Sequence, residues 1–307
     1  MEMKNFVKVV GLVSCFFVSG TVSAQQDILL SQEYFSRVNK NPASTGNSED
    51  VDIFLHGKIL WAGVENGPKN MVLNVTDYIE KIKSGLGVSV SYTNVGVGHH
   101  ATNAKVIYNY QVDLNEHFIL SMGLGAGINL ISMDYLANSI EDETERHEVD
   151  YLNEKQSKIS PDINVGFELN NPHWTLGVSM AHVLSGDTTV LKPKRHFYAY
   201  TSFSCPIGDN WALVPMLAYM HQKQANVADI GLLAFFQGSY WGGVSWRPDI
   251  QDQLQQSLLA FSVGFEIKKF RFGYSFDLGL GSDNMLPSNT HEVMLSYGIS
   301  KKGNKNR

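Results

Sequence analysis

Cysteine is scarce in this chain, and its scarcity excludes a disulfide-stabilised fold. The 307 residues contain two cysteines, Cys15 and Cys205. Cys15 falls within an expected leader, residues 1–24, so a chain cut after Ala24 keeps only Cys205. A single thiol cannot form an intramolecular bridge, which excludes the class of small secreted proteins that disulfides hold together.

Long apolar runs are also missing. Lys4 and Lys8 precede a short apolar stretch, 9–18, and small residues follow at Val22 and Ala24, a pattern typical of a secretory signal peptide. An uncleaved anchor is the alternative, but the stretch is shorter than the roughly 20 residues that a bilayer-spanning helix needs. No later stretch is long and apolar enough. The sequence therefore predicts an exported protein, either a soluble β-protein or an outer-membrane barrel.

Signals for nucleic-acid binding and for catalysis are lacking as well. The formal net charge is −6, which offers no basic surface for nucleic acid. Gly123–Gly127 lacks the spacing of a nucleotide-binding loop, and no phosphate-binding, zinc-protease or serine-hydrolase motif occurs. We therefore expect no enzyme, no cofactor and no metal site. His99-His100 is interpreted as part of a turn, and the acidic run 141–150 either as a solvated loop or as a site for divalent cations.

The most informative pattern is a regular alternation of apolar and small or polar residues. Between residues 120 and 130, every even position is apolar, whereas the odd positions hold Ser, Gly or Asn. A period of two places one class on each face of a β-strand, whereas a helix would mix them. Because the larger, apolar face recurs up to the C-terminus, we expect an all-β, antiparallel transmembrane β-barrel of outer-membrane type, with that face in lipid.

The alternation predicts about 14 strands, an even number that is typical of such barrels. Most have about the 9–11 residues that a tilted membrane-spanning strand requires. Their expected ranges are 51–61, 69–77, 85–95, 102–112, 117–131, 160–170, 173–183, 195–205, 210–220, 226–236, 239–247, 256–267, 269–279 and 290–300. The expected organisation is a signal peptide (1–24), an N-terminal periplasmic or plug segment (25–50), one barrel domain (51–300) and a basic tail (301–307).

Loops, charges and aromatic residues fit a barrel better than a soluble sandwich. Short turns and long polar loops alternate along the chain, as they do on the two rims of an outer-membrane barrel. The first two connections break this rule, since 63–68 is short and 77–84 is long. Strand parity puts Asp52, Lys58, Lys105, Glu168 and Asp229 on the small face. Strand 195–205 is ambiguous because aromatic residues occupy both of its faces.

Three short segments resemble a known family in their order and spacing. They are the opening Asn41-Pro42-Ala43-Ser44-Thr45-Gly46, the hairpin with Trp61, Gly63, Gly67, Pro68 and Lys69, and the closing residues Gly273, Tyr274, Asp277, His291 and Glu292. Together they resemble the PorP/SprF family of type IX secretion system membrane proteins from Bacteroidota. Two features depart from the family pattern: Ala43-Ser44-Thr45 replaces an aromatic residue, and the chain continues into its basic tail.

The resemblance implies an outer-membrane barrel that works with other type IX secretion components and with a secreted client, including large or gliding-motility adhesins. We expect the polar segment 25–50 to lie at the periplasmic mouth or to plug the lumen, in a non-enzymatic barrel that docks a client or a periplasmic partner. The alternative is a diffusion channel or a transporter of hydrophobic, fatty-acid-like molecules. A lipid hydrolase is a third and weaker hypothesis.

Overall fold

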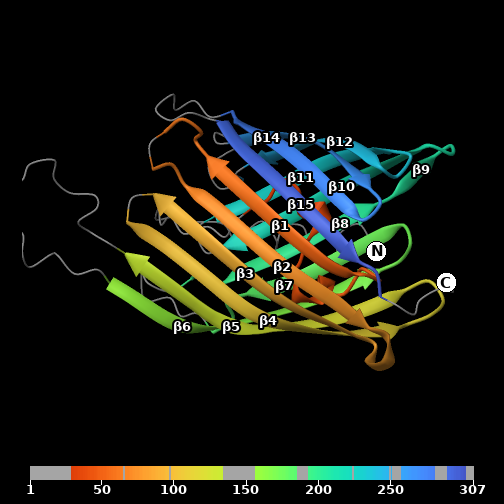
Figure 1. Ribbon diagram of the computed structural model, residues 1–307, viewed down its shortest axis with the longest axis horizontal. Coiled ribbons are helices and arrows are strands. Elements are labelled where there is room, and N and C mark those ends of the chain that lie inside the picture. Colours follow the sequence, from red (N-terminus) through yellow and green to blue (C-terminus); the bar gives the residue numbers. More distant parts are fainter. Residues whose placement is uncertain are drawn as a thin grey trace, which may run out of the picture.

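The structure is a closed antiparallel β-barrel (Figure 1). The computed structural model describes residues 29–64, 66–96, 98–133, 156–184, 193–222, 225–248, 250, 257–280 and 289–301. Each strand pairs with its neighbours along the chain, and β15 returns to pair with β1, from Val51 opposite Ile299 to Leu60 opposite Thr290. Closure leaves no unpaired edge, which a membrane-spanning sheet requires.

The strands follow one another without crossovers. Their bounds are β1 (Val51–Leu60), β2 (Lys69–Ile79), β3 (Ser84–Gly96), β4 (His99–Asp113), β5 (Ile119–Met133), β6 (Gln156–Asn170), β7 (Trp174–Ala181), β8 (His196–Phe203), β9 (Cys205–Ile207), β10 (Trp211–Gln222), β11 (Ala225–Phe236), β12 (Tyr240–Pro248), β13 (Ser257–Ile267), β14 (Phe270–Gly279) and β15 (Asn289–Ile299). Three short 3₁₀ helices are η2 (Glu33–Phe35), η3 (Pro42–Ser44) and η4 (Glu80–Ile82). Among the described residues, no helix is long and apolar enough to span a bilayer.

The strands β8 and β9 form one strand of the barrel with a break between them. Both pair with β10, Ser202 opposite Met216 and Cys205 opposite Leu213, and the register does not change across the gap. Pro215 lies within the gap and has no N–H to donate. Counted in this way the barrel has fourteen strands, so the predicted fold and strand number are confirmed. The break itself was not predicted.

The two faces of the wall follow the predicted alternation. Val106 and Ile159 point outward with 64% and 66% of their surface exposed, whereas Lys58, Glu168 and Glu292 are buried inside the barrel. A lipid-facing charge is costly, and a lumen-facing one is not. The ambiguous strand is β8, which turns Tyr198 and Tyr200 inward and Phe197 outward. Inward tyrosines need polar partners for their hydroxyls, and those of Tyr200 are described below.

The two ends of the barrel differ in the length of their connections. At the end where β1 begins and β15 ends, the connections are short: 80–83, 114–118, 171–173, 208–210, 237–239 and 268–269. We call this end the terminal mouth and the opposite end the loop mouth. The long connection expected at 77–84 is wrong. The strand β2 continues to Ile79, so only the four residues 80–83, which include η4, connect it to β3.

Candidate functional site

The candidate site is the chain before β1, which passes through the inside of the barrel. Residues 29–50, here called the internal segment, begin in the half nearer the loop mouth, where Lys58 Nζ donates a hydrogen bond to the Leu29 carbonyl at 2.9 Å. They end at the terminal mouth, where Asp50 forms an ion pair with Lys269 in the β13–β14 turn. Asn41 and Ala43, in the middle of the segment, have no exposed surface.

The first anchor of the internal segment lies where the barrel closes between β1 and β15. The Ser31 backbone N–H donates to Glu292 Oε2 at 2.9 Å, and Ser31 Oγ donates to Asp277 at 2.8 Å. Lys58 Nζ lies 2.6 Å from Glu292 and 3.2 Å from Asp277, and His56 Nε2 lies 3.0 Å from Glu292. Charge-assisted bonds of this kind are stronger than neutral ones. One cluster therefore joins the segment to β1, β14 and β15.

The second anchor is centred on Glu168 of β6, whose side chain is fully buried. Arg37 Nε donates to it at 3.1 Å and Asn47 at 2.6 Å, both from the internal segment. The Tyr200 hydroxyl and Asn170 complete its shell from the wall. Burial alone would lower the pKa of Arg37, but the Glu168 charge and hydrogen bond, together with the nearby Tyr200 and Tyr34, outweigh it and raise that pKa above its ordinary value. Arg37 is therefore a permanent cation inside the barrel.

Between Arg37 and Asn47, the two segment residues of the second anchor, the Asn41–Gly46 motif forms a tight turn against the wall. Asn41 caps η3 by accepting the Ala43 N–H at 2.9 Å, and its Nδ2 donates to the Phe167 carbonyl and to Tyr200, each at 3.0 Å. Pro42 occupies the first turn of η3, where its missing N–H costs nothing. Gly46 adopts a φ of +78°, which favours glycine.

Glycines of the wall face the internal segment because no larger residue fits there. A Cβ at Gly123 would fall on the backbone of Pro42 and Ala43. Similar overlaps occur at further wall glycines: Gly85 against Thr45, Gly166 against Asn41 and Gly273 against Gln32. The glycines on the inner face of the alternating strands are thus where the segment and the wall come closest.

The structure brings together only part of the expected motif residues. Asn41, Pro42 and Gly46 lie in the internal segment, Asp277 and Glu292 belong to the first anchor, and Gly273 faces the segment. Tyr274 and His291 contact each other by a 2.7 Å hydrogen bond. A separate group forms the β1–β2 hairpin at the loop mouth: Trp61, Gly63, Gly67, Pro68 and Lys69.

Sequence reasoning did not identify Ser31, Arg37 or Tyr200 as site residues, and it assigned Lys58 and Glu168 only to the inner face. The signal that could have found the two wall residues is their charge on a face of small side chains. No group of three potential metal ligands occurs within the described ranges. His100 is hydrogen-bonded to Tyr92 at 2.9 Å. The acidic run 141–150, the leader 1–24 and most of the basic tail lie outside the described residues.

The matching family model decides the family of this chain. The family described as "Type IX secretion system membrane protein PorP/SprF" matches residues 22–297. The chain belongs to this family. The resemblance drawn from its motifs is thereby confirmed, and together with the barrel fold it supports an outer-membrane location for this PorP/SprF protein.

Solved outer-membrane barrels share the fold of this PorP/SprF protein. The "CymD monoaromatic hydrocarbon channel" aligns with a TM-score of 0.52 and 13% identity over 91% of this chain and 95% of that one. The toluene transporter TbuX of Ralstonia pickettii gives 0.51 and 11% over 85% and 92%. Omp33 of Acinetobacter baumannii gives 0.50 and 11% over 82% and 99%. No curated protein matches the chain. Identities this low establish the fold alone.

Proposed function

We propose that this PorP/SprF protein is a non-enzymatic docking barrel of the type IX secretion system. It holds a secreted client, adhesin-like in kind, or a periplasmic secretion component at one mouth and supports the client's export and surface attachment. The observation that carries the proposal is the internal segment, which two buried anchors fix inside the lumen. A lumen filled by its own chain suits a docking platform better than a diffusion channel.

The terminal mouth is the docking end in this proposal. Short connections mark the periplasmic rim of an outer-membrane barrel, and the short connections of this barrel lie at that mouth. Near the end of the internal segment, Asn47–Glu49 are exposed there. They offer a periplasmic partner a surface that the anchors hold rigidly in place.

Deletion of residues 25–46 tests the proposal in the native host. We expect the barrel still to reach the outer membrane, detected by the shift in gel migration between heated and unheated samples, while surface display of the client is lost. A sharper variant combines Ser48→Arg with Glu49→Arg, which changes the exposed face and leaves both anchors intact.

Glu116→Arg is the matched control, because Glu116 is an exposed residue of the β4–β5 turn at the same mouth. It should leave display unchanged. Normal client display in both the deletion and the Ser48/Glu49 variant would contradict the proposal.

A further inference from the structure

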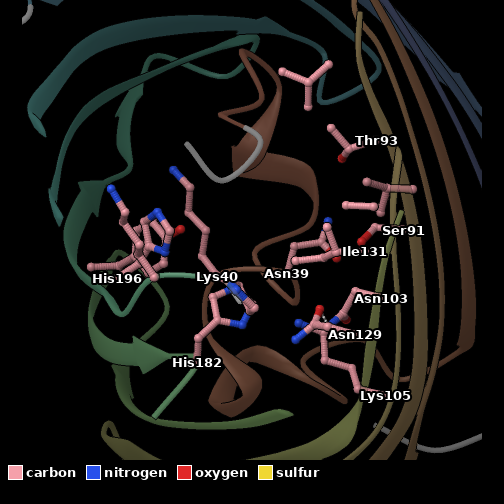
Figure 2. Close-up of a pocket in the computed structure, with 16 residues that line it drawn as sticks. Asn39, Lys40, Ser91, Thr93, Asn103, Lys105, Asn129, Ile131, His182 and His196 are labelled. Atoms are coloured by element: carbon pink, nitrogen blue, oxygen red, sulfur yellow. Dashed lines mark hydrogen bonds between the residues drawn. The ribbon is translucent and has the colours of Figure 1, made fainter. Parts of the chain in front are cut away.

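The outer face of the wall near the loop mouth carries polar side chains that point away from the internal segment. Figure 2 shows the inner face of the same wall, where Asn103 and Lys105 of β4 lie on the side of Asn39 and Lys40 of the internal segment. Alternate residues of a strand point to opposite faces, so His100 of β4 points outward. Such a side chain faces the membrane or its surface.

Directly paired residues of five neighbouring strands form one row on this outer face. His291 of β15 lies opposite Ile59 of β1, which lies opposite Lys69 of β2. Lys69 lies opposite Asn94 of β3, which lies opposite His100 of β4. Neighbouring strands are about 4.8 Å apart, so each histidine is about 10 Å from Lys69 along the row. We call these residues the loop-mouth row.

Lys69 is the only Lys or Arg on the outer face of the strands that the structure describes. Its side chain is exposed, and it forms no ion pair with any described residue. The one acidic residue on the outer face of those strands is Asp77, which lies at the other end of β2 and pairs with Lys301. A lipid-facing cation costs least where it reaches the head groups, so Lys69 belongs at that depth.

Each histidine of the loop-mouth row is held by a tyrosine of an adjacent strand. The Tyr92 hydroxyl lies 2.9 Å from His100 Nδ1, and the Tyr274 hydroxyl lies 2.7 Å from His291 Nδ1. A phenol is more acidic than a neutral imidazole, so we assign the hydroxyl as the donor and the ring proton to Nε2. Each imidazole then offers an Nε2–H donor even when it is uncharged. The same pair of residues thus occurs on both sides of Lys69.

Apolar side chains continue the outer face beside the loop-mouth row. Met71, the next outward residue of β2, has 54% of its surface exposed. Phe276 lies opposite His291 in β14, with 5.3 Å between the two ring centres. Tyrosine rings are typical of the depth where acyl chains meet head groups. A ligand of this surface therefore needs an anionic group joined to an apolar chain.

We propose that Lys69, His100 and His291 bind the phosphate groups of anionic lipids in the leaflet at the loop mouth. The Lys69 ammonium supplies charge, and each Nε2–H donates to an anionic oxygen. Because the three side chains are spread along the row, each takes its own phosphate, and the acyl chains lie on the apolar face below. The site gives a role to three motif residues that neither anchor uses: Lys69, Tyr274 and His291.

Native mass spectrometry of the full-length barrel in detergent tests this binding. The two probes are dioleoyl phosphatidylglycerol, which carries a net negative charge, and dioleoyl phosphatidylcholine, which is neutral overall. We expect the tightest phosphatidylglycerol to bind about tenfold more tightly than phosphatidylcholine, equal to about 1.4 kcal/mol. This preference should fall as the salt concentration rises, because the charges are exposed.

Substitutions locate the binding at the loop-mouth row. Lys69→Gln should weaken the tightest phosphatidylglycerol about tenfold. The matched control is Lys268→Gln, because Lys268 is also an exposed lysine without an ion pair among the described residues but lies in the β13–β14 turn at the terminal mouth. The double variant His100→Phe with His291→Phe should reduce the number of bound lipids and leave the tightest one in place.

Gel migration of unheated samples shows whether each variant has folded, and Lys69→Gln with its control decides even if the histidine variant fails. Equal affinities for the two lipids, or the same affinity in Lys69→Gln and Lys268→Gln, would overturn the proposal. An unchanged number of bound lipids in a folded histidine variant would overturn the assignment of the histidines. Glycerol 3-phosphate displacing the lipid at equal concentration would also overturn the proposal, since the site would then recognise free phosphate.

Discussion

At the scale of single residues, Glu168 is the wall residue whose loss should loosen the internal segment most. Its carboxylate receives Arg37 and Asn47 from the segment and Tyr200 and Asn170 from the wall. Removing one partner of a buried ion pair costs more than the pair contributes, because the other charge stays behind without compensation. The Arg37 guanidinium cannot lose its proton to escape this cost.

We therefore expect Glu168→Gln to lower the stability of the barrel by about 3–5 kcal/mol, the usual cost of breaking a buried pair. Thermal unfolding in detergent, followed by tryptophan fluorescence, measures the change. Asp113→Asn is the control, because Asp113 pairs with Lys83 while both are 58% exposed, and such pairs contribute about 0–1 kcal/mol. Equal melting temperatures in the two variants would refute the role of Glu168.

Gly123 gives a second prediction, with a control two positions away on the same inner face. Its Cβ would overlap the backbone of Pro42 and Ala43, whereas a Cβ at Gly125 would meet Asn164 Cβ at 3.6 Å, an ordinary contact. Gly123→Ala should displace the internal segment at a cost of about 1–3 kcal/mol, and Gly125→Ala should be tolerated.

Thiol labelling detects the displacement. In a Cys205→Ser background, Ser44→Cys reports on a position that is 7% exposed. Labelling should accelerate severalfold when Gly123→Ala is added and should not change with Gly125→Ala. The same rate in both variants would show that the segment does not rest on Gly123.

At the scale of elements, the period of two accounts for what could be predicted. In each strand, alternate side chains face the lumen and the lipid, so the sequence of one strand is enough to tell its inner face from its outer face. Strand existence and parity were therefore accessible, whereas the ends of β2 and the break between β8 and β9 were not. Those depend on turn chemistry at η4 and on Pro215 in the adjacent strand.

The site was accessible to a smaller extent. The motif residues Asn41 and Glu292 attracted attention through family resemblance, but nothing local tells that Arg37 meets Glu168, since 131 positions separate them. Tyr200 made the strand 195–205 ambiguous, because an aromatic residue on the inner face did not fit the alternation of apolar and small residues. Only the path of the internal segment supplies the partner that explains it.

At the scale of elements, we predict how the cost of a lipid-facing lysine depends on its depth in the membrane. Val106 points outward at the middle of β4, and Ile159 points outward near the loop-mouth end of β6. Val106→Lys should cost about 2–4 kcal/mol and Ile159→Lys about 0–1, since the penalty falls toward the interface. Reversible folding into lipid vesicles in urea measures both. A larger cost at Ile159 than at Val106 would contradict a bilayer centred on the middle of the strands.

At the scale of the whole molecule, the filled lumen separates docking from transport. The internal segment packs the ring of Phe35 against that of Trp241, with 4.5 Å between ring centres, and the guanidinium carbon of Arg271 lies over the Phe35 ring, 5.1 Å from its centre. Apolar and charged contacts thus hold it across the width of the barrel. This packing is what supports docking over diffusion in the proposed function.

Planar bilayers provide the measurement. We expect the full-length protein to give no steady conductance, and the deletion of residues 25–46 to give open-channel currents, because the segment is the material that occupies the lumen. In the intact protein the segment packs against Gly123 and Gly273, so we expect no steady current at either polarity of the applied voltage. A steady current from the intact protein would instead support a diffusion channel.

The internal segment has no linker before β1: Asp50 is followed at once by the strand that closes the cylinder against β15. The cluster of Ser31, Lys58 and Glu292 ties the far end of the segment to the same pair of strands. Any force that withdraws the segment therefore pulls directly on the seam of the barrel. Emptying the interior of the intact protein would therefore load the wall at the one place where its first and last strands meet.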